Sequence, residues 1–167
     1  MKFVPIQKEH LSRIKKWRNE QTRILRQNKV LTDKDQQEWF KNINKGQVLF
    51  AMLEYGELIG YCGLTHLDQE NKRAEITFLV ATPRNKMRCF GNDFENAINF
   101  LCSYGFNILG LHKIFAEVFE YRKNVIKLLE ENGFKKEGVL KDHIIKKEHH
   151  SHRNKFYDSI IMARLQK

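Results

Sequence analysis

The sequence has few cysteines, no long apolar run and no stretch of simple composition. Its three cysteines form no CxxC pair and are odd in number, so we expect reduced thiols in a cytoplasmic protein. No apolar run approaches the ~18 residues that span a bilayer. The start, MKFVPIQKEHLSRIKKW, has no long apolar stretch, so we expect neither a secretory signal nor a membrane partner. Without a linker or repeat, the chain is expected to form one domain over residues 1–167.

The charge of the chain is strongly positive but evenly distributed. The formal net charge is +10, which suits anionic partners such as nucleic acid or a phosphate-bearing small molecule. Hydrophobic residues make up 41% and charged residues 30%, which is typical of a globular protein. Because the basic residues form only short runs, charge alone decides nothing, and a nucleic-acid binder is the weakest interpretation.

The apolar periodicity changes along the chain between that of helices and that of strands. A mixed sheet with helices on both faces is expected from the order of these elements, which is an α/β arrangement. Helices are expected at residues 9–20, 33–43, 92–109 and 122–132, and strands at residues 2–6, 47–55, 58–67, 73–81, 112–120, 134–140 and 155–165.

The stretch PRNKMRCFGNDFENAINFL follows the apolar run that ends at Val80. It leads through a basic loop into a predicted helix, the position at which many α/β enzymes bind a phosphate group. Such loops are usually rich in glycine, whereas this one contains only Gly91. The sequence therefore raises the question of whether the loop still binds an anion.

The order of elements, with AEITFLV before this loop and LGLHKIFAEVFEYRKNVIKLLEENGFKKEGVL after it, resembles the GNAT superfamily of acetyl-CoA-dependent N-acetyltransferases. The resemblance is closest to the ribosomal-protein N-terminal acetyltransferases. It implies a twisted, mostly antiparallel sheet of about seven strands and a single acetyltransferase domain over residues 1–167. The implied reaction is direct transfer of an acetyl group from acetyl-CoA to a primary amine.

The N-terminal segment WRNEQTRILRQNKVLTDKDQQEWF is similar to acetyltransferases that act on nucleotide-linked amino sugars in surface-polysaccharide pathways. This similarity implies a nucleotide-linked amine as acceptor, contacted by residues of the segment. The guanidinium groups of the arginines in this segment suit a diphosphate. The alternative is that the tryptophan is part of the core and the arginines lie on the surface. The implied acceptor-binding residues are Trp17, Arg18, Asn19, Arg23 and Arg26.

In the superfamily, backbone N–H groups of the loop bind the coenzyme's pyrophosphate, with the pattern Gln/Arg-x-x-Gly-x-Gly/Ala. Counting back from Ala97 places the two small positions at Asn92 and Phe94, so this sequence departs from the pattern. Backbone donors do not depend on the side chain, so coenzyme binding is still expected. The alternative is a helix capped by Asn92 or Asp93 without a ligand. Implied coenzyme contacts in this loop are Arg88, Cys89, Phe90, Gly91, Asn92, Asp93 and Phe94, with added positive charge from Arg84 and Lys86.

Glu75 is the leading candidate for the general base, because it is a carboxylate within an otherwise apolar strand. An ion pair with Arg73 or across the strands is the alternative. His66, at the end of the preceding strand, is expected beside Glu75 or at the plain surface. The resemblance also implies an acidic position near the site at Asp158, which can instead pair with a lysine.

The resemblance further implies that a backbone N–H of the Phe78–Leu79–Val80 segment stabilises the oxyanion. Two residues common in relatives are absent: an asparagine and a proton-donating tyrosine, whose positions are Arg122 and Leu129 here. Asn124 is a substitute for the first contact. Arg122 and Lys127 are expected to contact the coenzyme, or to lie on a solvated helix face.

No metal site is expected, although Glu148, His149, His150 and His152 cluster on a predicted hairpin tip. The main rivals to an amino-sugar acetyltransferase are acetylation of a protein N-terminus and a non-catalytic acyl-CoA-binding module. A homodimer is compatible with the sequence.

Overall fold

A computed structural model describes residues 1–43, 45–87, 89–147 and 153–167. Its helices are α1 (Leu11–Glu20), α2 (Asp33–Lys41), α3 (Phe90–Ser103) and α4 (Lys123–Glu131), with short helical turns at Lys8–His10, Thr22–Ile24 and Arg84–Lys86. Its strands are β1 (Lys2–Pro5), β2 (Val48–Glu54), β3 (Glu57–Asp68), β4 (Arg73–Val80), β5 (Lys113–Phe119), β6 (Lys135–Lys147) and β7 (Asn154–Leu165). Among the residues so placed, none of the helices has the length and apolar character needed to span a bilayer.

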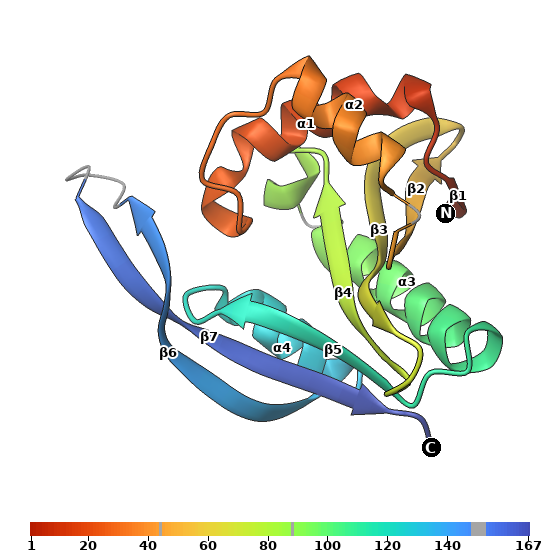
Figure 1. The fold of residues 1–167 in the computed structure, drawn as a ribbon, viewed down its shortest axis with the longest axis vertical. Helices are drawn as coiled ribbons and strands as arrows, with labels where there is room; N and C mark the ends of the chain where they lie inside the picture. Colours follow the sequence, from red (N-terminus) through yellow and green to blue (C-terminus); the bar gives the residue numbers. More distant parts are fainter. Residues whose placement is uncertain (44, 88, 148–152) are drawn as a thin grey trace.

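The strands form one seven-stranded sheet in the order β1-β2-β3-β4-β5-β7-β6, and only β4 and β5 are parallel neighbours. The predicted fold class is therefore confirmed. The β4–β5 pairing is short, because it joins only Arg73–Glu75 to Lys113–Phe115. Figure 1 shows the two strands meeting at one end and diverging toward the other, so that the sheet opens into a V. The candidate site lies where β4 and β5 diverge.

Alternation of side chains along β4 and β5 separates two apolar layers. Even-numbered residues of both strands, such as Phe78 and Ala116, face the core that includes α3 and α4. Leu79 faces the second core, which includes α1 and α2. Glu75 and Glu117 share the parity of Leu79, so both carboxylates lie on the α1–α2 face of the sheet.

The structure changes several predicted boundaries. The strand predicted over residues 134–140 is longer, because β6 continues to Lys147. The β2–β3 turn is at Tyr55 and Gly56, which both have positive φ, rather than at Gly56–Glu57. The helix predicted over residues 92–109 begins earlier and ends as α-helix at Ser103, after which the backbone forms a π-helical turn over Tyr104–Ile108. A π turn adds a residue without changing the apolar periodicity much, so the sequence pattern does not show it.

Candidate active site

A cleft of about 750 Å³ passes through the gap between β4 and β5. On the α1–α2 face its lining includes Trp39, Tyr61 and Glu75, and on the opposite face it reaches Phe94 and Leu129. The cleft therefore joins the two faces of the sheet. A reaction between a ligand on one face and a ligand on the other can take place where the strands diverge.

Glu75 is buried in the sheet and lies beside His66, whose Nδ1 is 2.9 Å from Glu75 Oε2. His66 has a φ of 49°, in the left-handed region, where the register of β3 shifts between Thr65 and Asp68. A bulge of this kind redirects a side chain, and strained residues concentrate at functional sites. The pairing of His66 with Glu75 follows the sequence-based expectation, whereas the bulge that produces it was not predicted.

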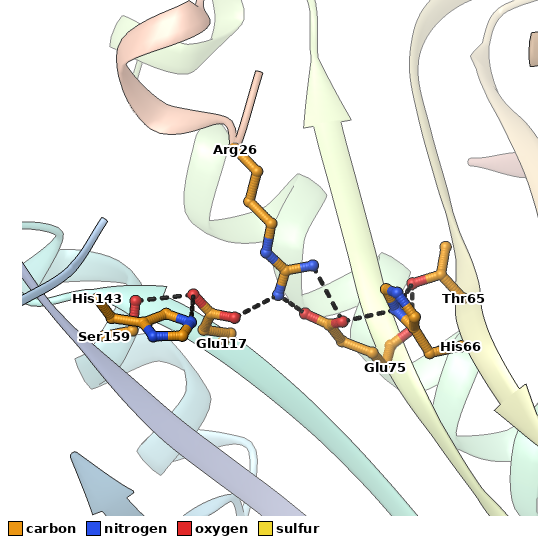
Figure 2. A network of polar contacts seen from close by, with 7 residues as sticks. All are labelled: Arg26, Thr65, His66, Glu75, Glu117, His143 and Ser159. Carbon is orange, nitrogen blue, oxygen red and sulfur yellow. Dashed lines mark hydrogen bonds and ion pairs between the residues drawn. The ribbon is translucent and has the colours of Figure 1, made fainter. Parts of the chain in front are cut away.

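A second carboxylate, Glu117 of β5, lies across the gap from Glu75. Figure 2 shows the guanidinium of Arg26 between the two carboxylates. Arg26 NH1 donates to Glu75 Oε2 at 3.1 Å, and NH2 donates both to Glu75 Oε1 and to Glu117 Oε2. The Ser159 hydroxyl donates to Glu117 at 2.7 Å, and His143 lies 3.9 Å from the same carboxylate. These contacts form one polar network.

Asp158 does not reach this network, which corrects its assignment as a catalytic candidate. Its carboxylate accepts hydrogen bonds from the Lys141 ammonium at 2.7 Å and from the backbone N–H of Asp142 at 3.0 Å. The bond from Lys141 lowers the pKa of Asp158. Side chains alternate along β7, so the neighbouring Ser159 is the residue that contacts Glu117.

The first turn of α3 borders the cleft on the opposite face. Counted forward from Arg88, the pattern Arg-x-x-Gly-x-Gly/Ala places Gly91 at its first small position and Asp93 at its second, so the sequence matches the pattern in part. Gly91 has no positive φ, and a Cβ added to it meets, among described atoms within 4 Å, only Leu128 Cδ2 at 3.9 Å. The fold itself therefore gives no reason for glycine there.

Asp93 is turned away from solvent, so it neither caps α3 as expected nor presents free charge to a phosphate. Its carboxylate accepts two bonds from Arg84, at 2.7 and 2.8 Å, and is 2% exposed. Arg84 also donates to Glu54 at 2.8 Å. Because Arg84 is committed to these acids, it is a structural residue and not added charge for an anion. Asn92 does not cap the helix either, since the N-cap residue is Cys89.

Aromatic side chains form the floor of the cleft on this face. Phe78 contacts Phe94 with ring centroids 5.1 Å apart and Phe90 at 5.9 Å. Phe78 and Phe94 line the cleft, whereas Phe90 is buried in the core. Counting back from Ala97 places Phe94 at the second small position, and its ring is part of the lining of the cleft.

The backbone of β4 beyond Glu75 has no β5 partner, because the pairing ends there. The Val80 carbonyl accepts from the Gln21 side chain at 2.8 Å, so the polar groups of Val80 face away from β3. Backbone polar groups alternate in direction along a strand, so the N–H and carbonyl of Phe78 also face away from β3, whereas the N–H of Leu79 faces β3. Of the expected oxyanion donors, Phe78 is thus the one at the lining of the cleft, and Leu79 is corrected to a core residue.

The start of α4 supplies a cation at the cleft. Arg122 lines the cleft and is half-buried, and no carboxylate within the described ranges bonds its guanidinium. Burial lowers the pKa of Arg122. Asn124 is exposed in the first turn, and Lys127 is exposed and paired with Glu131 at 3.7 Å, so neither lines the cleft. Leu129, at the position of the missing tyrosine, is buried there.

The family model of the acetyltransferase (GNAT) domain matches residues 4–154. The chain belongs to the GNAT acetyltransferase family. Enzymes of this family use acetyl-CoA, so the expected acetyl donor agrees with the family. The narrower resemblances to ribosomal-protein and nucleotide-sugar acetyltransferases are not shown by this match.

Two curated relatives extend the comparison. An uncharacterized N-acetyltransferase p20 of Bacillus licheniformis is 42% identical over 91 residues, which are 54% of this chain and 48% of that protein. A spermidine N(1)-acetyltransferase of Vibrio cholerae is 34% identical over 83 residues, or 50% of this chain and 46% of that protein. The aligned stretch thus spans about half the length of the curated relatives.

The fold is also that of a solved GNAT acetyltransferase. A crystal structure of spermidine N-acetyltransferase from Vibrio cholerae, in complex with CoA and spermine, superposes with a TM-score of 0.83 at 21% identity. The comparison covers 99% of this chain and 95% of that chain. At this identity, the likeness establishes the fold alone.

The acceptor residues expected in the N-terminal segment of this acetyltransferase have separate roles. Trp17 is buried in the α1–α2 core, and Asn19 bonds the backbone N–H and carbonyl of Leu31, so both are structural. Arg23 stacks over Tyr121 with its guanidinium 5.8 Å from the ring centroid. Arg18 and Arg26 line the cleft, with Arg18 over Trp39 at 5.3 Å. Only two of the five expected residues therefore lie at the cleft.

Two expectations fall on residues that the structure does not describe: the coenzyme contact at Arg88, and the cluster of Glu148, His149, His150 and His152. In the remainder of the chain, no group of three or more His, Cys, Asp or Glu residues is arranged to bind a metal ion.

Sequence reasoning missed three residues of the polar network, which are Glu117, His143 and Ser159. It also missed Lys146, which lies outside the cleft and bonds the segment 22–28 that carries Arg26. Glu117 carries the signal that identified Glu75, a carboxylate in an otherwise apolar strand, KIFAEVF. Lys146 carries no such signal, because it belongs to a basic run in β6.

Proposed function

We propose that this protein is an acetyl-CoA-dependent N-acetyltransferase that transfers the acetyl group directly to a primary amine. The observation that carries the proposal is the cleft through the β4–β5 gap, which has acids on one face and, on the other, the cation Arg122, which no described carboxylate bonds. An amine acceptor suits the face with Glu75 and Glu117. The coenzyme's phosphates suit the face with Arg122 and the N-terminus of α3.

In this arrangement Glu75 takes the proton from the acceptor ammonium, directly or through a water molecule, before the amine attacks the thioester. The N–H of Phe78 would donate to the thioester's carbonyl oxygen as that oxygen gains charge. Leu129 cannot protonate the departing thiolate. A thiol has a pKa of about 8.5, so the thiolate leaves without a dedicated acid and takes a proton from solvent.

Gly91 supports coenzyme binding at α3. Glycine in a helix costs roughly 0.5–1 kcal/mol relative to alanine, and no described neighbour requires its small size. The absence of a side chain is explained if a phosphate approaches the backbone N–H groups of the first turn.

The acceptor we favour is a small cationic amine, such as a polyamine. Two carboxylates at the acceptor face favour a positively charged substrate, and one relative is a spermidine N(1)-acetyltransferase. A nucleotide-linked amino sugar is the second candidate, favoured by Arg18 at the cleft. It is less well supported because Arg23 and Arg26, expected to bind its diphosphate, are engaged elsewhere.

Thiol release from acetyl-CoA, measured with a panel of amines, tests the proposal. The panel contains spermidine, a nucleotide-linked amino sugar and a peptide with a free N-terminus, so that each candidate acceptor has a representative. We expect turnover with spermidine and a steep loss in Glu75→Gln, with coenzyme affinity nearly unchanged. Absence of release with every amine, while coenzyme still raises the melting temperature, would identify a binding module instead.

A further inference from the structure

Arg26 occupies the space between the two acids that face the acceptor side of the cleft. Its guanidinium is bidentate on Glu75 and also bonds Glu117. The carboxylates are 8% and 10% exposed, whereas the Arg26 side chain is 48% exposed. A guanidinium is always charged, so this cation neutralises one of the two buried negative charges.

The position of Arg26 is fixed by an anchor outside the cleft. Lys146 of β6 is buried, and its ammonium donates to Thr22 O at 2.9 Å, Gln27 O at 3.1 Å and Asn28 Oδ1 at 2.7 Å. It also donates to the carbonyl of Leu25, next to Arg26. One ammonium thus contacts four oxygens of the segment 22–28, with one of its three N–H groups shared between two of them. The β6 strand thereby keeps the Arg26 backbone at the open end of the gap.

The contacts of Arg26 are those that an acceptor amine requires. An ammonium approaching Glu75 needs carboxylate lone pairs on the side that faces the cleft. In this structure Oε1 accepts from Arg26, and Oε2 accepts from Arg26 and lies 2.9 Å from Nδ1 of His66. Since Glu75 also has to take the acceptor's proton, Arg26 and a reactive amine compete for the same oxygens.

We propose that the Glu75–Glu117 pair is a cation-binding site which Arg26 fills in the free protein, and that the acceptor's ammonium displaces Arg26 from it. The inference rests on the proposed function. It makes Arg26 a specificity-determining residue, because only an acceptor with a cationic group able to replace a guanidinium opens the site. It also reverses the expected role of Arg26, which becomes a competitor of the substrate and not a ligand for its phosphates.

Calorimetric titration of spermidine into the protein, with and without CoA, tests this proposal directly because it needs no turnover. In Arg26→Gln the competing cation is removed, and we expect the dissociation constant to fall on the order of tenfold, since the binding-competent fraction rises. Arg26→Lys keeps a cation there and should restore weaker binding. Arg13→Gln, which removes one charge from an exposed pair with Glu57 away from the cleft, controls for net charge.

Steady-state kinetics give the second readout. Arg26→Gln should lower KM for spermidine by a similar factor, with a smaller change in kcat. A higher KM or weaker spermidine binding in Arg26→Gln would show that Arg26 binds substrate. Equal gains in Arg13→Gln would show a general charge effect, and absence of spermidine binding to either protein would remove the cation site; each of these overturns the inference. Tighter binding without turnover would support the cation site and reject the proposed function.

Discussion

Replacing Gly91 with alanine should separate the stability of the fold from the binding of the coenzyme. Gly91 is in the first turn of α3, has no positive φ and has an open position for a methyl group among described atoms, with Leu128 Cδ2 at 3.9 Å. Alanine should therefore stabilise the free protein by roughly 0.5–1 kcal/mol. For a chain of this size, that corresponds to an increase in melting temperature of roughly 1–4 °C.

The same methyl group should weaken coenzyme binding. If a phosphate bonds the N–H groups of the first turn, the added Cβ keeps it from at least one charge-assisted hydrogen bond, which is worth about 1.5–3 kcal/mol. The dissociation constant of CoA should then rise roughly 10-fold or more.

Thermal unfolding without ligand and calorimetric titration of CoA measure the two effects. Gly138→Ala is the control, because a Cβ at Gly138 meets nothing within 4 Å among described atoms and the residue lies in β6, away from the cleft. The control should keep wild-type CoA affinity. If Gly91→Ala binds CoA as tightly as the wild type does, the small residue has no role in coenzyme binding and the placement of the phosphates is wrong.

Three further predictions concern the surroundings of the site. Arg84→Met should destabilise the fold by about 3 kcal/mol, because it leaves the buried Asp93 carboxylate without its partner; chemical denaturation measures the loss, and Arg84→Met with Asp93→Asn should recover part of it. Lys146→Met should cost about 1–3 kcal/mol by leaving partly buried carbonyl groups without their donor and should speed amide hydrogen exchange in the segment 22–28; unchanged exchange there would contradict its role as an anchor. Burial raises the pKa of Tyr121 to about 12. The contribution of Tyr121 to stability is therefore complete below its unfolded-state pKa of about 10 and is lost as the pH rises toward 12. The difference in unfolding free energy between wild type and Tyr121→Phe should shrink over that range, and a constant difference would contradict the shift.

The sequence predicts the fold well because periodicity records which face of each element is buried. The seven strands and four helices were predicted in the correct order, and Glu75 was recognised because a carboxylate interrupts an apolar strand. Long-range polar contacts leave no such periodic signal. The hydrogen bond from Arg26 to Glu117 joins residues that are 91 positions apart in the sequence. Lys146 is more than 100 positions from the residues of the segment 22–28 that it bonds.

Local backbone geometry was the other source of error. The left-handed backbone at His66 has no glycine or proline beside it to mark it, and the π turn that begins at Tyr104 contains Gly105, which a helical pattern tolerates. The side chains of Asp93 and Asp158 show a related limit: Asp93 does not cap α3, and Asp158 pairs with a lysine, which was one of its two expected roles. Each carboxylate can pair with a cation or face a ligand, and only the structure shows Arg84 and Lys141 beside them.

A crystal structure of the protein with CoA tests the central claim most directly. We expect the pyrophosphate at the N–H groups of the first turn of α3, the guanidinium of Arg122 turned toward a phosphate, and the thiol in the β4–β5 gap near the N–H of Phe78. Coenzyme bound at another surface, with Phe94 closing the gap, would contradict the account.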